Sequence, residues 1–365
     1  MKKTLLALAI AATATSVNAA EIYSNDDTKV SLKGEVDIYL KQSEVEKTKW
    51  EKDGKDAKGN DKFKAVDTTE KKELDVSTWA KIQLDAEQKL NDQFTAFASF
   101  EIEADDDGKA KFDDVWVGFK TDTWGMAFGE TGDLAESADA IQKDDITNEG
   151  NYMGSTGGHH RESKGHGVVF KGEFVEGLTL VADVNTTSEE DVDNTYGISA
   201  DYAFSNFSLG TSYIAGEAEK DIDYSLAGVS ASAEFGGLYL ALTYAQFEGA
   251  NEFGYWEYKG SVSDKDAKGY FNGDTMGFAA AYQMDKVRLY TTYAIANLDE
   301  RATSTGNQKL PKDIEVDNLV VGVDYAFRDN ILFLAEYQTA TLESNTAGQK
   351  DYDADTVTAG VYYTF

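Results

Sequence analysis

The sequence contains no cysteine and a single proline, Pro311. The absence of cysteine excludes disulfide scaffolds, thiol catalysis and cysteine-ligated metal centres. Arginine is also scarce, with four residues, while 66 acidic side chains bring the formal net charge to -32. Nucleic-acid binding needs clustered lysine and arginine side chains, so we expect no nucleic-acid partner.

Long hydrophobic runs are missing as well. The apolar stretch Leu5–Ala12 is too short for a transmembrane helix, which needs about 20 residues, and no later run approaches that length. Two lysines precede this stretch, and small residues ending in "VNA" follow it. This pattern is typical of a secretory signal peptide. We therefore expect residues 1–19 to be cleaved and residues 20–365 to form the mature domain, with a net charge of about -34.

Alternation of apolar and polar residues dominates the mature chain from about residue 29 onward. Clear examples are "VSLKGEVDIYL" (30–40), "FTAFASFEIE" (94–103) and the last segment, "DADTVTAGVYYTF" (353–365). A period of two is typical of β-strands with two different faces, and no stripe with a helical period of useful length is present. Aromatic residues make up 12% of the chain, which argues against disorder despite the high charge.

Short and long connections alternate strictly between these segments. The short polar turns lie at 90–92, 121–123, 174–177, 204–206, 235–237, 284–286 and 327–330. The longer polar stretches lie at 42–73, 105–111, 130–164, 186–194, 216–223, 249–273, 297–315 and 341–354. Seven short turns and eight long loops join sixteen strands. The sequence therefore predicts an all-β fold, a sixteen-stranded antiparallel transmembrane β-barrel.

A secreted β-sandwich is the alternative, because its apolar face would simply be its core. Two features argue against it. Aromatic residues sit on the apolar row where strands meet the short turns, as in an interfacial girdle: Phe204, Phe207, Phe235, Phe327 and Phe365. The opposite row carries many charges, which would be costly in a dry core but would be solvated around a water-filled lumen: Glu101, Glu103, Asp183, Asp201, Asp324 and Glu336. In lipid the sheet must close, so we expect the last strand to pair with the first.

Four segments carry a resemblance to a known family. They are "AEIYSNDDTKVSLKGEVD" (20–37), "STWAKIQLDAEQKLNDQFTAFASFEIE" (77–103), "HHRESKGHGVVFKGEFVEGLTLVADV" (159–184) and the terminal strand that ends in phenylalanine. Over nearly its whole length the mature chain resembles the general diffusion porins of Gram-negative bacteria. The resemblance implies a barrel in the cell outer membrane, in contact with its lipid and lipopolysaccharide. It also implies a homotrimer in which the second loop (105–111) latches onto a neighbouring subunit, and a terminal strand that the assembly machinery reads.

The third loop, 130–163, is the candidate site, because in the resembled family this loop folds inward and narrows the pore. Its acidic residues are Glu130, Asp133, Glu136, Asp139, Asp144, Asp145 and Glu149. We expect some of them at the constriction, facing basic groups of the barrel wall. The alternative is an ordinary solvated acidic loop. The Pro-Glu-Phe-Gly-Gly segment that this loop commonly carries in the family is absent from the chain.

The basic wall groups of the family are also reduced in number. Lys81 stands where the family has an arginine, and Arg161 fills another such position, whereas Glu35, Asp113 and Glu130 stand where basic residues are usual. Arg288 alternates with Val287 and Leu289, so we expect it to face the lumen. Fixed carboxylates around an aqueous constriction concentrate cations and exclude anions. The sequence therefore predicts a cation-preferring channel for passive diffusion of small hydrophilic solutes and ions.

Two other functions stay open. A substrate-specific channel would need a file of aromatic residues in the lumen, and four candidates are scattered along the chain: Trp79, Trp116, Tyr239 and Tyr290. A non-channel surface barrel, acting as an adhesin or receptor, would display its loops, of which the first (42–73) is long and rich in lysine and acidic residues.

Catalysis and metal binding find little support. The three histidines, His159, His160 and His166, lie near Ser155 and Ser163, but no sequence context marks a nucleophile. The acidic run 105–107 lacks the spacing of an EF-hand calcium loop. We therefore expect no enzymatic activity, no resident metal and no cofactor.

Overall fold

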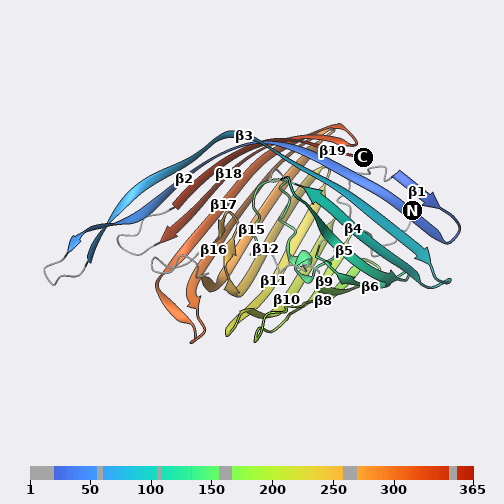
Figure 1. The fold of residues 1–365 in the computed structure, drawn as a ribbon, viewed down its shortest axis with the longest axis horizontal. Coiled ribbons are helices and arrows are strands. Elements are labelled where there is room, and N and C mark those ends of the chain that lie inside the picture. The colour runs from blue at the N-terminus through green and yellow to red at the C-terminus, as the bar shows by residue number, and fades with distance from the viewer. Residues whose placement is uncertain are drawn as a thin grey trace.

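The computed structural model describes residues 20–55, 61–104, 108–132, 134–155, 167–257, 269–344 and 352–365. The first half of the barrel wall consists of β2 (Thr28–Lys55), β3 (Asp61–Lys89), β4 (Thr95–Ala104), β5 (Ala110–Lys120), β6 (Trp124–Gly129), β7 (Gly167–Val175), β8 (Leu178–Asn185) and β9 (Thr195–Phe204). The second half consists of β10 (Phe207–Glu219), β11 (Ile222–Phe235), β12 (Leu238–Ala250), β15 (Tyr270–Met284), β16 (Val287–Ala302), β17 (Gln308–Arg328), β18 (Ile331–Ser344) and β19 (Tyr352–Thr364). The predicted sixteen-stranded antiparallel barrel is confirmed (Figure 1). In the described part of the chain, no helix has the length and hydrophobicity needed to span a bilayer.

The sheet closes where the last strand meets the first, as expected from the need to pair every backbone group in lipid. β19 pairs with β2 from Asp353 opposite Glu46 to Thr364 opposite Glu35. Phe365 then exchanges two backbone hydrogen bonds with Gly34, both of 2.8 Å. A short additional strand, β1 (Ala20–Ser24), pairs with the stretch of β2 that lies beyond this point. Both ends of the described chain therefore lie at one seam (Figure 1).

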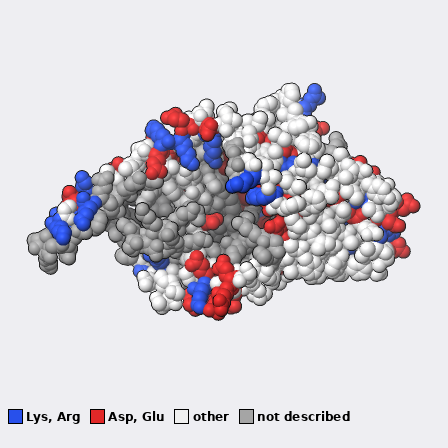
Figure 2. Space-filling view, in the orientation of Figure 1, with Lys and Arg blue, Asp and Glu red and all other residues white. Residues whose placement is uncertain are grey.

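The strands alternate between an apolar outer face and a polar inner face. On β2, Ile38 is 46% exposed on the outside, whereas the neighbouring Asp37 is 3% exposed on the inside. The same exposed apolar row continues around the barrel, for example at Val117, Ile198 and Leu242. Figure 2 shows mostly uncharged side chains over the barrel wall, with charged ones toward its ends and on the projecting hairpin of β2 and β3. The predicted orientation, with apolar side chains toward lipid, is confirmed.

Aromatic rings form a belt at the short-turn end of the outer face. The rings of Tyr202, Phe204, Phe207 and Phe235 follow one another with centroids 5.4 to 5.7 Å apart. A second series joins Tyr325, Phe327 and Phe333, and Tyr363 lies 5.9 Å from Phe365. Tyrosine, tryptophan and phenylalanine prefer the membrane–water interface, so this belt fits the predicted girdle.

The connections agree with the sequence at the short turns and differ at some long ones. All seven short turns join the strands where they were predicted. In contrast, the loop expected over 42–73 is mostly strand: β2, with 28 residues, continues to Lys55, and β3, with 29 residues, begins at Asp61, so the two form a projecting hairpin (Figure 1). Ion pairs such as Lys71–Glu44, at 2.6 Å, cross this hairpin. Because charged side chains occupy both faces, the hydrophobic period disappears while the backbone pairing continues.

We expect Phe365→Ala to weaken the seam between β19 and β2. The ring of Phe365 covers Gly34, so close that a β-carbon at Gly34 would lie 2.3 Å from the ring. Removing the ring exposes this backbone and should lower the free energy of unfolding by about 1–2 kcal/mol. Urea unfolding of the refolded protein in detergent measures the change. Phe365→Tyr keeps the ring and should behave as the wild type; equal losses in both variants would contradict the role of the ring.

Candidate functional site

The described part of the connection between β6 and β7 lies inside the barrel, as the family resemblance implied for the third loop (Figure 1). We call its described residues from 130 onward, apart from residue 133, the inner loop. It contains a single 3-10 turn, η1 (Ser137–Ile141), four of whose five side chains are buried against β8 to β12. The backbone N–H of Glu136 donates to Asp139 Oδ2 at 2.9 Å and starts this turn. Five residues are too few for a periodic signal, so the sequence did not predict the turn.

Glycines on the inner face of the wall make room for the inner loop. They lie on four strands where the loop passes: Gly197 on β9, Gly210 on β10, Gly228 on β11 and Gly277 on β15. A β-carbon at Gly210 would lie 1.6 Å from the carbonyl oxygen of Ala140, and one at Gly277 would lie 1.8 Å from Asp144 Oδ2. The wall therefore forms a shallow track that only glycine permits. Sequence reasoning missed this track, although glycines at inward positions of nearby strands were a readable signal.

Wall carboxylates hold the first half of the inner loop. Ser137 donates to Asp183 on β8 through its backbone N–H and, at 3.0 Å, through its hydroxyl group. Lys143 forms an ion pair with Asp201 on β9. These wall carboxylates were expected to be solvated by water, but Asp183 is buried beneath the loop that it binds.

The second half of the inner loop is bound by β16 to β19. Glu336 accepts the backbone N–H groups of Asn148 at 2.7 Å and Glu149 at 2.8 Å, and also the hydroxyl group of Tyr290 at 2.6 Å. The Asn148 amide donates to Asp324 Oδ1 at 2.7 Å. Glu336 and Asp324 are buried, so the expectation that water solvates them is wrong here too. Buried carboxylates need such donors, because an unpaired buried charge is strongly unfavourable.

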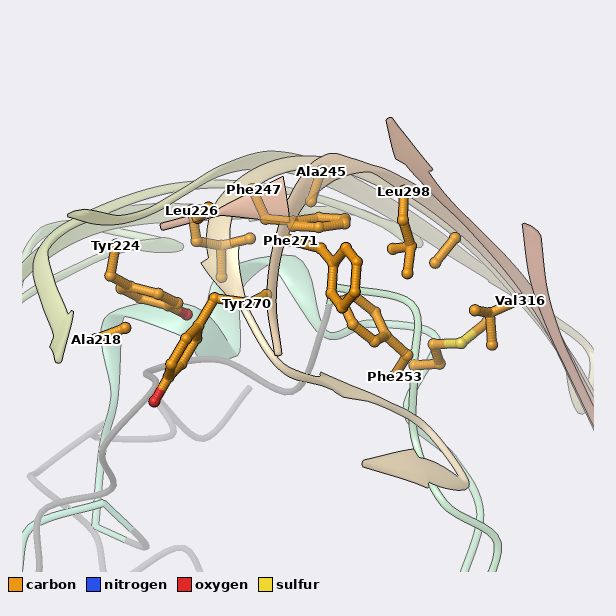
Figure 3. Packing of buried hydrophobic residues seen from close by; sticks show 14 of the residues in the cluster. Ala218, Tyr224, Leu226, Ala245, Phe247, Phe253, Tyr270, Phe271, Leu298 and Val316 are labelled. Carbon is orange, nitrogen blue, oxygen red and sulfur yellow. The ribbon is translucent and has the colours of Figure 1, made fainter. Parts of the chain in front are cut away.

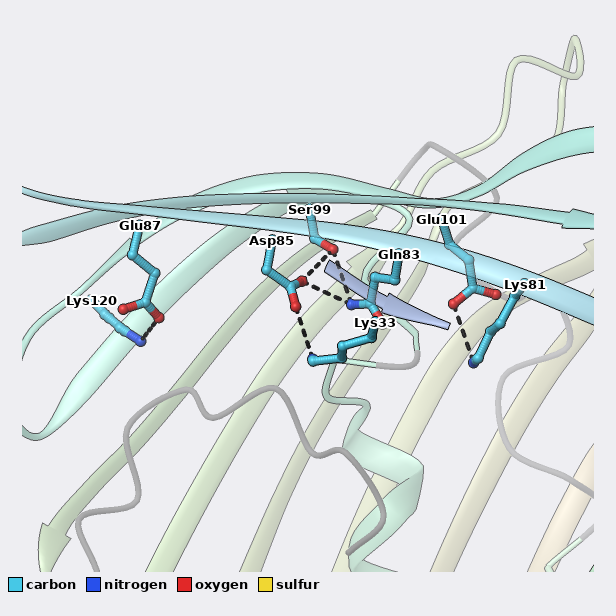
Figure 4. A network of polar contacts seen from close by, with 8 residues as sticks. All are labelled: Lys33, Lys81, Gln83, Asp85, Glu87, Ser99, Glu101 and Lys120. Atoms are coloured by element: carbon cyan, nitrogen blue, oxygen red, sulfur yellow. Dashed lines mark hydrogen bonds and ion pairs between the residues drawn. The ribbon is translucent and has the colours of Figure 1, made fainter. Parts of the chain in front are cut away.

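The wall between these two sets of anchors, formed by β2, β3 and β5, carries a row of lysines, each paired with a neighbouring carboxylate (Figure 4). The pairs are Lys33–Asp85 at 2.8 Å, Lys81–Glu101 at 3.1 Å and Lys120–Glu87 at 2.6 Å. Gln83 and Ser99 also donate to Asp85, at 2.9 and 2.8 Å. The prediction named Lys81 but missed Lys33 and Lys120, whose inward position follows from the alternation along β2 and β5. The positive charges of this wall are therefore largely balanced within the wall itself.

The seven predicted acidic residues of the loop occupy different environments. Asp139 and Asp145 are exposed, whereas Glu136 and Glu149 are half-buried. Asp144 is 2% exposed and accepts hydrogen bonds from Thr243 and Tyr152, so it faces the wall. Burial raises the pKa of Asp144, and these two hydrogen bonds oppose the shift. The remaining two are Glu130, whose carboxylate accepts the backbone N–H of Val115 at 3.1 Å, and Asp133, which lies outside the described residues.

The other predicted site residues lie on the wall. Glu35 on β2 stands opposite Lys81 on β3, and Asp113 on β5 stands opposite Glu101 on β4. Arg288 faces inward, donates to Asp324 through Nε at 2.6 Å and lies 4.3 Å from the ring centre of Tyr290. Arg161 and the three histidines lie outside the described residues. Within the described ranges, no group of three or more acidic or histidine side chains is placed to hold a metal ion.

A closed barrel with an apolar exterior, a polar interior and an inward loop defines an integral membrane barrel of the channel-forming class. A family model described as Gram-negative porin matches residues 6–345. The chain therefore belongs to the Gram-negative porin family, whose members are channels, and its place is the outer membrane.

Named relatives agree with this assignment. The chain is 26% identical to porin-like protein H of Photobacterium profundum over 304 residues, which cover 81% of this chain and 82% of that protein. It is 24% identical to the outer membrane porin OmpD of Salmonella typhimurium over the full length of both. Two solved structures share the fold. The loop L8 deletion mutant of Vibrio cholerae OmpT has a TM-score of 0.67 at 16% identity, covering 93% of this chain and 100% of that one. Salmonella typhi OmpF in complex with daunomycin has a TM-score of 0.66 at 18% identity, covering 95% and 100%.

We expect Gly210→Ala to displace the inner loop toward the pore axis. The new methyl group would occupy the place of the Ala140 carbonyl, so η1 must move away from the wall and the open cross-section must shrink. Single-channel recording should show a lower conductance than the wild type. Gly360→Ala on β19 is a matched control, because its methyl group would meet Leu334 at 3.3 Å and no part of the inner loop. Equal conductance in the two variants would contradict the inference that the glycines of the wall make room for the inner loop.

Proposed function

We propose that this porin forms a water-filled, cation-preferring channel for passive diffusion of small hydrophilic solutes and ions. The observation that supports this proposal is an excess of negative over positive charge inside the barrel. The lysines of the wall are balanced by carboxylates at 3.1 Å or less, and the inner loop adds two acidic side chains at exposed positions, Asp139 and Asp145. Burial of its carboxyl group and the neighbouring Asp144 raise the pKa of Asp145 to about 6, so it is still mostly ionised at neutral pH. The water column between the loop and the wall therefore meets net negative charge.

The expected selectivity is electrostatic and depends on salt. Charges on the loop and the wall act over a screening length of about 10 Å at 0.1 M salt, and of about 3 Å at 1 M salt. Within that distance, fixed carboxylates raise the local concentration of cations and lower that of anions. The formal net charge of the whole chain, -32, has the same sign.

Reversal potentials across a salt gradient in planar bilayers test the ion preference. The wild-type channel should favour cations at low salt, and this preference should decline as the salt concentration rises. Lys81→Glu reverses a charge next to Glu101 and Glu35, so the ratio of cation to anion permeability should rise by roughly twofold. Lys81→Arg keeps the charge and should leave the ratio unchanged. An anion preference at low salt would refute the proposal. An unchanged permeability ratio in Lys81→Glu would show that Lys81 does not line the pore.

A second role, surface recognition, is favoured by one observation. The hairpin of β2 and β3 projects far beyond the other strands at the long-loop end of the barrel (Figure 1). A partner outside the cell would meet this hairpin first. Both roles are compatible, but a purified protein that binds cells without conducting ions would favour the adhesin or receptor function over the channel.

The proposal extends to assembly and maturation. One of the similar structures is described as the trimer form of Vibrio cholerae OmpT, which supports a homotrimer here, embedded in outer-membrane lipid and lipopolysaccharide. The lysine pair and short apolar stretch before Ala19 support cleavage at that point.

We expect protein extracted from the outer membrane to have an intact mass that corresponds to residues 20–365, and to close in three equal steps during single-channel recording. A single closing step would favour a monomeric pore, and a mass that includes residues 1–19 would exclude the proposed cleavage.

A further inference from the structure

The first described part of the connection between β12 and β15, residues 251–257, also turns into the barrel. These residues form a two-strand hairpin of β13 (Glu252–Phe253) and β14 (Trp256–Glu257). We call these residues the mouth hairpin. The sequence predicted only a polar loop over 249–273, yet Phe253 is 1% exposed and Asn251 is also buried. A polar surface loop would not bury a phenylalanine so completely, so this segment has a structural partner inside the barrel.

Aromatic contacts tie the mouth hairpin to distant parts of the wall. The ring centre of Phe253 lies 5.4 Å from that of Phe247 on β12 and 6.4 Å from that of Phe271 on β15. The ring of Trp256 lies 6.0 Å from that of Tyr352 on β19. β15 and β19 are four strands apart, which corresponds to roughly 19 Å along the wall. The mouth hairpin therefore bridges a wide arc of the barrel.

The turn of the mouth hairpin rests on the inner loop. Gly254 has a φ of +60°, and a β-carbon there would lie 3.0 Å from Cβ of Met153 in the inner loop and 3.4 Å from the side chain of Asn318 on β17. Met153 is 1% exposed. The Asn318 amide in turn donates to the Asn151 carbonyl at 2.6 Å. The hairpin, the inner loop and the wall thus form three packed layers, with the turn at Gly254 directly against Met153.

Apolar side chains fill the space around these layers (Figure 3). They point inward from the wall, where a water-filled barrel would carry polar groups: Ile214, Leu226, Phe247, Phe271, Leu298 and Val316. The inner loop contributes Ile141 and Met153 to the same cluster. Close-packed apolar side chains exclude water, so this side of the lumen carries no ions.

We propose that the mouth hairpin is a second constriction element. At the level of the apolar cluster it closes the part of the lumen next to β10–β18, holds the inner loop against the wall and restricts the open channel there to the side of Lys33, Lys81 and Lys120. The upper size limit for solutes is then set by two loops together. This inference rests on the channel assignment and is independent of the ion preference.

Phe253→Ala tests the role of the hairpin in conduction. Loss of the anchoring ring should free the hairpin and raise the single-channel conductance by about twofold, since conductance grows with the cross-section of the water column. Uptake of larger sugars into proteoliposomes should rise more than uptake of small ones, and Phe253→Leu should restore the wild-type values. Phe112→Ala is the control, because Phe112 is 65% exposed on the outer face. Conductance and sugar discrimination equal to the wild type in Phe253→Ala would overturn the proposal.

A cross-link tests the position of the hairpin independently. The chain has no cysteine, so the pair Met153→Cys with Gly254→Cys introduces the only two thiols. A β-carbon at Gly254 would lie 3.0 Å from that of Met153, so the turn must move away by about 0.5 Å to reach the 3.5–4.5 Å range of a disulfide. We expect the bond to form by oxidation of the folded protein in membranes and to leave the conductance unchanged. Failure to form it in a folded variant would place the hairpin elsewhere and refute the inference. This result holds whether or not the wild-type protein conducts.

Discussion

Backbone pairing in lipid is the constraint on which the structure depends. A bilayer offers no hydrogen-bond partner to a free N–H or C=O group, so the sheet must have no open edge. β19 meets this need by pairing with β2 over twelve positions, and Phe365 completes the seam through two hydrogen bonds to Gly34. Once the barrel is closed, the alternation of side chains separates an apolar exterior from a polar interior. The carboxylates and glycines on the inner face of the wall can then bind and make room for the loops that enter the lumen.

The interior is used mainly to hold loops. Asp183, Asp324 and Glu336 are buried and accept hydrogen bonds from the inner loop or from groups beside it. Each bond replaces water at a carboxylate, and several of them together fix a loop that has little regular structure of its own. On the neighbouring strands β2 to β5 the inward carboxylates pair with lysines instead. One chemical group, the inward carboxylate, therefore anchors the loop on some strands and balances lysine charge on others.

The fold was largely predictable, and the site only in part. The seven short turns, the outward apolar row and the inward third loop were all expected, the last through a family resemblance. The side chains of Lys81 and Arg288 pair with buried carboxylates of the inner face, in line with side-chain alternation, and their role at the constriction stays a prediction. The partner of Asp144 was not predictable, since Thr243 is 99 positions away along the chain. The glycine track and the mouth hairpin were missed for the same reason: each depends on contacts between segments that only the closed barrel brings together.

The sequence by itself determined the class of protein: a barrel of sixteen strands with lipid outside and charge inside. It did so because a period of two between alternating short and long connections, with aromatic residues beside the short turns and charges on the inner row, favours a barrel in lipid over a sandwich with a dry core. Only the tertiary structure decided which carboxylates remain exposed and which are covered. Their environment depends on the path of two loops across the lumen, and that path follows from packing against glycines and aromatic rings of distant strands.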